Sequence, residues 1–385
     1  MTHRLTRQEL LQRAAFGAAL ASIPGFAAAC GGSSSSSSAS GGTQKLASTL
    51  RFSNWPLYID VNEKTKSHPT LDAFTKKTGV KVDYTEDINS NSEYFGKIQG
   101  PLSRGQSINR DIIVLTDNER YLALMLDKGW AEPLDKDVLV NITNLVDVQR
   151  HPGFDPERKY TLPWQSGMTG IAYNAKLTKP ILSMEQLLTD PSLKGKITVL
   201  NDFADTLGLV MLDNGDDPSK VTDATFKSSL DRIKEASDSG HIRQFTGNDY
   251  AGPLSKGDLI ACVAWSGDIV QLQADNPNLK WNIPAKGGMI WTDNMLIPKG
   301  GDAYTASTYM NYVYTPAVAA KMAAGIQYVT PVKGAQQVLA KTDSKLASNP
   351  LIFPTEATLS RVHLIDPAAL KNQSYNEQWQ AVLGA

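Results

Sequence analysis

Short apolar segments that alternate with segments of helical periodicity restrict the fold of this sequence more than any other feature. Residues 111–115 (DIIVL) form a continuous apolar run, which is typical of a strand buried on both faces. Two strands are expected before it, at 50–55 and 80–84. Helices are expected at 71–78 and at 91–99. This order favours an α/β fold with a mainly parallel sheet.

The alternation continues along the rest of the chain. Further strands are expected at 196–200 and 259–264, and further helices at 121–128, 206–213, 225–236, 305–313 and 316–324. In open α/β sheets, ligands bind beyond the carboxyl ends of the strands. Four residues stand at or just past such ends and are therefore candidate site residues: Trp55, Thr116, Asp202 and Trp265.

The first 29 residues have the pattern of a secretory signal. Arginines precede the mainly apolar run 14–29, which is short for a membrane span. The end of this run, AAAC, resembles a bacterial lipobox, in which the cysteine is lipidated. We therefore expect residues 1–29 to be a signal peptide and Cys30 to carry a lipid; a cleaved signal that leaves Cys30 free is the alternative. The export route, twin-arginine or general secretory, stays open.

A serine- and glycine-rich stretch follows Cys30. Residues 31–42 (GGSSSSSSASGG) have nothing to bury and no stiffness, so residues 30–46 are expected to be a flexible tether. The globular body would then be held at the outer face of a membrane, in an extracytoplasmic compartment. The second cysteine, Cys262, lies in an apolar run and is expected to be a small buried residue.

Composition excludes several functions. The chain has 385 residues, which suggests two domains, and a net charge of −1 without a basic stripe, so no nucleic-acid partner is expected. Its five histidines show no metal-ligand spacing, and HExxH, CxxC and GxSxG motifs are absent. We therefore expect no metal, no cofactor and no enzyme. A carboxylate-based secreted hydrolase stays as a less favoured alternative, because acids are plentiful.

A tryptophan stands two residues before an aspartate in WTDNMLIP. Alternate residues of a strand point to the same face, so Trp291 and Asp293 would project together. The plain alternative is a core tryptophan and an aspartate in a turn or a helix cap. Similar pairings recur in the chain: Trp55 with Tyr58, Trp265 with Asp268, and the acids Asp202 and Asp205. Asp205 could equally be the N-cap of the helix that follows it.

Aromatic rings combined with carboxylates suit an organic cation. A ring face attracts an ammonium group by about 0.5–2 kcal/mol. A charged hydrogen bond to a carboxylate contributes about 1.5–3 kcal/mol, and each buried methylene about 0.8 kcal/mol. An aliphatic polyamine uses all three interactions. The sequence therefore predicts a site for a polyamine or a related cation.

From residue 50 to residue 338 the chain resembles the spermidine/putrescine-binding extracytoplasmic proteins of ABC importers. The resemblance lies in an ordered set of motifs with matching gaps: Asn54-Trp55-x-x-Tyr58, Ser92-x-Tyr94, Asp111-Ile112-Ile113-Val114, Tyr160-Thr161-Leu162-Pro163-Trp164 with Gly170, Asp202-x-x-Asp205, Trp265-Ser266-Gly267-Asp268, Gly287-Gly288-x-x-Trp291-x-Asp293-x-x-x-Ile297-Pro298 and Tyr328-Val329-Thr330-Pro331.

This resemblance implies a two-lobe, type II periplasmic-binding-protein fold with crossover hinge segments. Lobe 1 would comprise 47–164 and 292–338, and lobe 2 would comprise 165–291 and 339–385. A monomer would close over its ligand and deliver it to an ABC permease. The family's ligand contacts would fall on Trp55, Tyr58, Thr116, Asp202, Asp205, Trp265, Asp268, Trp291, Asp293 and Tyr328.

The chain also departs from the family pattern. Pro56 and Leu57 stand where some members carry an acid, and Asp205 is shorter than the glutamate often found there. These changes favour a diamine over a long triamine, with Asp117 as a candidate to compensate. An opine or a cationic amino acid derivative in the same fold is the alternative. Trp164 is left open between ligand contact and hinge core; Trp130, Trp281 and Trp379 are expected to be structural.

Overall fold

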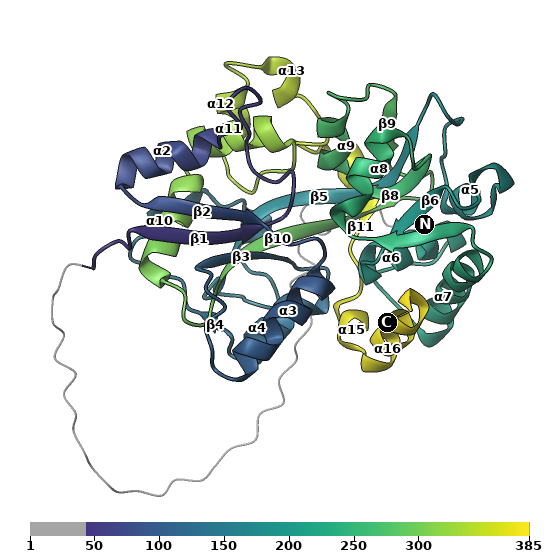
Figure 1. Cartoon of the computed structure of the whole chain (residues 1–385), viewed down its shortest axis with the longest axis horizontal. Coiled ribbons are helices and arrows are strands. Elements are labelled where there is room, and N and C mark those ends of the chain that lie inside the picture. Colours follow the sequence, from purple (N-terminus) through teal and green to yellow (C-terminus); the bar gives the residue numbers. More distant parts are fainter. Residues whose placement is uncertain (1–43, 385) are drawn as a thin grey trace, which may run out of the picture.

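The computed structural model describes residues 44–384, which form two halves joined across one continuous sheet (Figure 1). The signal peptide, Cys30 and the tether up to residue 43 lie outside the described residues. The strands run Thr49–Asn54 (β1), Lys81–Glu86 (β2), Ile112–Thr116 (β3), Ala131–Glu132 (β4), Thr161–Asn174 (β5), Ile197–Leu200 (β6), Ile242–Thr246 (β7), Ala261–Trp265 (β8), Leu279–Asn282 (β9), Gly288–Pro298 (β10) and Val362–His363 (β11).

The sheet has the strand order β2-β1-β3-β10-β5-β8-β6-β7. Within the first half, β1 pairs in parallel with β2 and β3, and within the second half β6 pairs in parallel with β7 and β8. The two middle strands, β5 and β10, run antiparallel to each other and to their neighbours β8 and β3. The sheet is therefore mixed: parallel within each half, as the alternating pattern predicted, and antiparallel where the halves join.

The strand β5 was not predicted from the sequence, although it is buried along its whole length. It lacks a continuous apolar run because Gln165, Ser166, Gly167 and Thr169 interrupt it. These small and polar residues are buried in the middle of the sheet, where β10 pairs with one edge of β5 and β8 and β9 pair with the other. Burial here is imposed by tertiary structure, which no local periodicity reports.

Every helix expected from periodicity is present, with ends shifted by about a turn or less. The α-helices run Pro69–Thr78 (α2), Asn91–Ser103 (α3), Arg120–Asp127 (α4), Met184–Thr189 (α5), Phe203–Asn214 (α6), Asp223–Asp238 (α7), Ala251–Lys256 (α8), Ser266–Leu272 (α9), Ala303–Val313 (α10), Pro316–Ile326 (α11), Ala335–Leu339 (α12), Ser344–Ala347 (α13), Glu356–Leu359 (α14), Pro367–Lys371 (α15) and Gln373–Leu383 (α16). Between residues 44 and 384, no helix is both long and apolar enough to cross a membrane.

The start of α6 settles one alternative left open by the sequence. The helix begins at Phe203, and the side chain of Asp202 accepts a hydrogen bond from the Asp205 amide at 3.1 Å. Asp202 is therefore the N-cap, and the reading of Asp205 as the cap is wrong. The helix starts a turn earlier than its apolar periodicity indicated, which leaves the Asp205 carboxylate free for other contacts.

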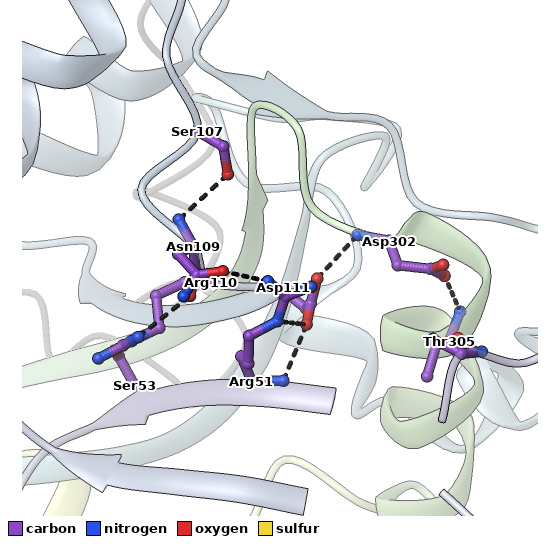
Figure 2. A network of polar contacts seen from close by, with 9 residues as sticks. Arg51, Ser53, Ser107, Asn109, Arg110, Asp111, Asp302 and Thr305 are labelled. Atoms are coloured by element: carbon purple, nitrogen blue, oxygen red, sulfur yellow. Dashed lines mark hydrogen bonds and ion pairs between the residues drawn. The ribbon is translucent and has the colours of Figure 1, made fainter. Parts of the chain in front are cut away.

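A polar network fixes the first half at the start of β3, away from the carboxyl ends of the strands (Figure 2). The carboxylate of Asp111 accepts hydrogen bonds from the backbone and side-chain nitrogens of Arg51 at 2.8 and 3.1 Å. Its second oxygen accepts from the amide of Asp302, whose own carboxylate accepts from the Thr305 amide at the start of α10. One buried acid thereby holds β1, β3 and α10 in register.

The aromatic core lies behind the carboxyl ends of the strands. Phe52 contacts Trp164 edge-on at 5.6 Å and Tyr309 at 5.5 Å between ring centroids. Trp164 in turn lies 6.5 Å from Tyr58, so it supports that residue from the core side. Cys262 is fully buried in β8, as expected.

We predict that a methyl group cannot be added at Gly170 on β5. A Cβ there would lie 2.3 Å from the backbone oxygen of Asn282, so Gly170→Ala should lower the free energy of unfolding by about 1–3 kcal/mol. The matched control is Gly96→Ala on the exposed face of α3, where a Cβ meets nothing within 4 Å. That variant should be stabilised by up to about 1 kcal/mol. Equal denaturation midpoints for Gly170→Ala and wild type would contradict the close approach of β9 to β5.

Candidate functional site

A cavity of about 320 Å³ lies where the two halves of the sheet meet. All ten residues that the sequence proposed as ligand contacts line this cavity, and three further residues join them. The complete lining is Trp55, Pro56, Tyr58, Thr116, Asn118, Asp202, Asp205, Asn248, Trp265, Asp268, Trp291, Asp293 and Tyr328. Trp130, Trp164, Trp281 and Trp379 lie outside it.

The topology explains why residues so distant in sequence meet here. Trp55 and Tyr58 follow β1, Thr116 ends β3, and Trp265 ends β8. The start of α6 follows β6 and carries Asp202 and Asp205, and the first turn of α9 carries Asp268. The carboxyl ends of these strands gather at one edge, as is usual in open α/β sheets. The joining strand β10 then adds Trp291 and Asp293 from the middle.

Five aromatic rings form a continuous chain along the cavity. Trp55 meets Trp265 edge-on with 5.6 Å between centroids, and Trp265 meets Trp291 at 6.1 Å. Trp291 lies 5.8 Å from Tyr328, which lies 4.8 Å from Tyr58. Trp55 belongs to the first half and Trp265 to the second, so the chain of rings crosses between the halves.

Each indole nitrogen in the chain of rings is held by the protein. Trp265 Nε1 donates to Asp205 at 2.9 Å and Trp291 Nε1 donates to the Thr169 hydroxyl at 2.9 Å. Trp55 Nε1 donates to the Val114 carbonyl oxygen at 3.2 Å. Because these N–H groups are satisfied, the three indoles offer their apolar and π-electron surfaces to the cavity and no free donor.

Two glycines make room for the rings. A Cβ at Gly167 would lie 2.4 Å from the Trp291 ring, and a Cβ at Gly267 would lie 2.4 Å from the Tyr328 ring. The ring positions therefore depend on the absence of a side chain on β5 and at the start of α9. Gly267 belonged to a motif noted in the sequence, whereas Gly167 carried no recognisable signal.

Hydrogen-bond donors hold the carboxylates in fixed positions. Asp268 accepts from Asn248 Nδ2 at 2.6 Å, Tyr250 Oη at 2.7 Å and Tyr328 Oη at 2.6 Å. Asp293 accepts from the Thr116 hydroxyl at 2.7 Å. All of these donors are neutral.

Asp205 accepts from neutral donors as well. Besides the Trp265 indole, Asn118 Nδ2 donates to it at 3.2 Å. The cavity lining contains no lysine or arginine, and none of Asp202, Asp205, Asp268 and Asp293 takes part in an ion pair within residues 44–384. The negative charge of these acids is therefore not compensated by any basic side chain beside them.

Burial accordingly raises the pKa of these carboxyl groups. The pKa of Asp205 and that of Asp268 rise to about 6, chiefly by desolvation and against the lowering effect of their hydrogen bonds. The pKa of Asp293 rises to about 7 for the same reason, with smaller contributions from Asp117 and Asp205. The pKa of Asp202 is raised well above its ordinary value by desolvation and then by Glu119. A cation in the cavity would oppose all of these shifts.

Sequence reasoning missed Asn118 and Asn248, because an isolated amide in a loop has no pattern. Asn118 Oδ1 and the Tyr58 hydroxyl are buried and have no hydrogen-bond partner within the described residues. Both can accept a hydrogen bond from a guest in the cavity. The acid proposed to compensate, Asp117, lies outside the lining and accepts from the Thr292 amide at 2.9 Å.

Ten of the thirteen cavity residues fall within a stretch that matches a known family; Trp55, Pro56 and Tyr58 precede it. Residues 70–354 match the family described as bacterial extracellular solute-binding protein. The spermidine/putrescine-binding periplasmic protein of Escherichia coli (strain K12) is 25% identical over 338 residues, which cover 86% of this chain and 91% of that protein. The putrescine-binding periplasmic protein PotF of the same organism is 27% identical over 347 residues, covering 83% and 87% respectively.

A solved structure agrees with the observed architecture. The spermidine/putrescine ABC transporter substrate-binding protein PotD of Streptococcus pneumoniae (strain Canada MDR_19A) aligns with a TM-score of 0.66 at 23% identity, over 88% of this chain and 100% of that chain. The predicted type II, two-lobe fold is thereby confirmed, and so is the resemblance to spermidine/putrescine-binding relatives. The chain belongs to the family of bacterial extracellular solute-binding proteins.

Proposed function

We propose that this chain is a lipid-anchored receptor that captures a polyamine in the cavity and delivers it to an ABC permease. The observation that carries the proposal is the combination of five aromatic rings, three buried carboxyl groups and the half-buried Asp202 around one cavity without a basic side chain. Relatives named for putrescine and spermidine binding support the same ligand class. In the proposed complex, the rings cover the methylene chain and the acids hold the ammonium groups.

Each end of the chain of rings offers a place for an ammonium group. Near one end, Asp293 lies close to the Tyr58 hydroxyl. Near the other, Asp205 lies beside the unpartnered Asn118 oxygen. An ammonium group has three donors and no acceptor, so it can bond a carboxylate and a neutral oxygen together.

The lining argues against the alternative cargoes. An opine or an amino acid derivative carries a carboxylate, and the cavity offers no lysine or arginine to pair with one. The acids that line the cavity would repel a negatively charged group on the ligand, which would raise their pKa values further. We therefore favour a cargo that carries positive charge alone.

Closure of the two lobes over the ligand is also part of the proposal, with the hinge in the strands β5 and β10. The loops after the two edge strands meet: the Asn89 carbonyl oxygen, beyond β2, accepts from the Asn248 amide, beyond β7, at 2.9 Å. Asn89 Oδ1 accepts from the Asp249 amide at 3.1 Å. Since β2 and β7 lie at opposite ends of the sheet, these bonds form only when the halves fold toward each other. The lobe division 47–164 with 292–338 and 165–291 with 339–385 stays a prediction.

The proposed lipid anchor rests on the sequence, and the proposed ABC permease partner rests on the family. Lipidation of Cys30 and the tether 30–46 would keep the receptor close to its permease while leaving it free to move. The monomeric state follows from the same proposal, because one cavity is complete within one chain. Mass spectrometry of the mature N-terminus would show a diacylglyceryl group on Cys30; an unmodified cysteine there would remove the anchor from the proposal.

We predict that Asp293→Asn weakens putrescine binding by about 2–5 kcal/mol, because the variant leaves an ammonium group without its charged partner. Thr116 can still donate to the asparagine oxygen, so the fold should be retained. Titration calorimetry at pH 8 measures the effect, with the exposed Glu235→Gln on α7 as control. Unchanged affinity in Asp293→Asn would remove this acid from the site, and absence of binding to wild type would reject the polyamine receptor.

Hydrolysis of a glycan or ester by the protein would contradict a purely binding role.

We predict opposite pH dependences for stability and for ligand affinity. A carboxyl group whose pKa is higher in the folded than in the unfolded protein stabilises the fold while it is protonated, and this stabilisation is lost as pH rises through the folded value. The ligand-free protein should therefore lose stability between about pH 4, the unfolded value, and the folded values of about 6 for Asp205 and Asp268 and about 7 for Asp293.

Affinity for an amine should rise over the same range, because the amine stays charged and binds the ionised acids. Putrescine should bind at least about tenfold more tightly at pH 8 than at pH 5, with proton release to the buffer near pH 6.5. Thermal unfolding and calorimetry across this range measure both trends. Affinity that does not change with pH would show that these acids do not face the ligand.

We predict that Gly247→Ala impairs closure without touching the ligand. A Cβ at Gly247 would lie 2.1 Å from the Asn89 carbonyl oxygen, a contact that exists only between the closed halves. Affinity for putrescine should fall by about 1–3 kcal/mol, mainly through faster dissociation. Gly252→Ala, where a Cβ meets nothing within 4 Å, is the control from the same segment. Wild-type dissociation rates in Gly247→Ala would contradict the proposed closure.

A further inference from the structure

A second cavity of about 210 Å³ adjoins the first. The two share Trp55, Asp202 and Trp265 in their lining, so they lie side by side. The remaining lining of the second cavity is almost entirely polar: Ser90, Asn91, Ser92, Glu119 and Asn201. This lining suits a charged or hydrogen-bonding group and not a methylene chain.

Glu119 is the new charged group in this cavity. It stands before α4 but does not cap that helix; instead its Oε1 accepts from the Phe203 amide at 2.9 Å, at the start of α6 in the other half. Glu119 is only 8% exposed. Asp202, beside it, uses Oδ1 to cap α6. Glu119 Oε2 and Asp202 Oδ2 accept no hydrogen bond from any N–H or hydroxyl group within residues 44–384.

Glu119 and Asp202 stand close enough for their negative charges to repel each other. Desolvation raises the pKa of Glu119 to about 7, and the charge of Asp205 adds to it. The pKa of Asp202 is raised first by desolvation and then by Glu119. The neighbouring Arg120 lowers the pKa of Glu119, and its guanidinium group lies over the Tyr121 ring, 5.2 Å from the centroid. A further cation between the two carboxyl groups would favour the ionised form of both.

An independent observation points to a donor missing from the same corner. Asn118 is 4% exposed, and its Nδ2 donates a hydrogen bond to Asp205. Its other side-chain atom, Oδ1, has no hydrogen-bond partner within the described residues. Asn118 and Asp202 line the main cavity together, and Asp202 also lines the second. An orphaned acceptor and two carboxyl groups thus stand at the junction of the cavities, and no basic side chain lines either one.

We propose that Glu119 and Asp202 form an additional cation subsite, which takes a further ammonium group of an elongated amine and makes the receptor discriminate amines by the number of their charges. The inference rests on the proposed function. It replaces the expectation that the departures at Pro56, Leu57 and Asp205 favour a diamine, since Glu119 supplies an acid elsewhere. On binding, a carboxyl group that is protonated in the empty site gives its proton to solvent, and the ammonium group pairs with the resulting carboxylate.

The test compares a triamine with a diamine in matched variants. Calorimetry with spermidine and with putrescine would be run on wild type, Glu119→Gln and the exposed control Glu235→Gln. Glu119→Gln should weaken spermidine binding by about tenfold or more, the loss of one charged hydrogen bond, and leave putrescine binding within about twofold. The glutamine oxygen can still accept from Phe203, so the thermal midpoint of the ligand-free variant should not fall. Spermidine should also release fewer protons from Glu119→Gln than from wild type.

The outcomes separate this inference from the proposed function. Equal losses for both amines, or no loss for either, would overturn the subsite while leaving a polyamine receptor in place. Wild-type protein that binds putrescine but not spermidine would overturn the subsite as well. If the wild-type protein binds neither amine, the proposed function fails and the subsite fails with it.

Discussion

Carboxyl groups buried beside neutral donors, without a basic side chain, are the constraint on which the rest of this structure depends. Asp268 alone is held by an asparagine and two tyrosines, and Asp293 by a threonine. Neutral donors fix the position of a carboxylate but compensate its desolvation only in part, which is why the pKa values of these acids stay high. Such a cavity is stable in two states: with its acids protonated, or with a cation inside it. The charge of the cavity lining therefore favours a cationic ligand.

The same strands that join the halves also place the rings. β10 carries Trp291 and Asp293 on one face, and β5 beside it carries Gly167, without which the Trp291 ring could not lie where it does. Because β5 and β10 pair along most of their length, a shift of register in one would move a ring and an acid together. Joining the halves and shaping the cavity are thus one structural task, and this explains why the long middle strands tolerate so many buried polar and small residues.

The sequence predicted those parts of the site that obey a local rule. Trp291 and Asp293 follow from the two-residue period of a strand, and Trp55, Thr116 and Trp265 from the ends of apolar runs. The remaining contacts depend on tertiary structure. The sequence left open whether Asp205 caps the helix, and the cap is Asp202, because capping is decided by backbone geometry and not by the apolar pattern. Asn118, Asn248 and Glu119 act across the gap between the halves, and residues of that kind leave no periodic trace.

Contacts between the halves use the same residues that would hold the ligand. Asn248 donates its amide hydrogen to Asn89 on the opposite half and its side chain to Asp268 in the cavity. Asn118 and Glu119, beyond β3, reach Asp205 and the start of α6. Opening the halves would therefore strip donors from two cavity acids and expose them to water, where they ionise at their ordinary pKa values. For this reason we expect charge and closure to be coupled in the proposed receptor: an open, hydrated and ionised site would attract a cation, and closure around the cation would replace water with fixed donors without leaving the negative charge alone.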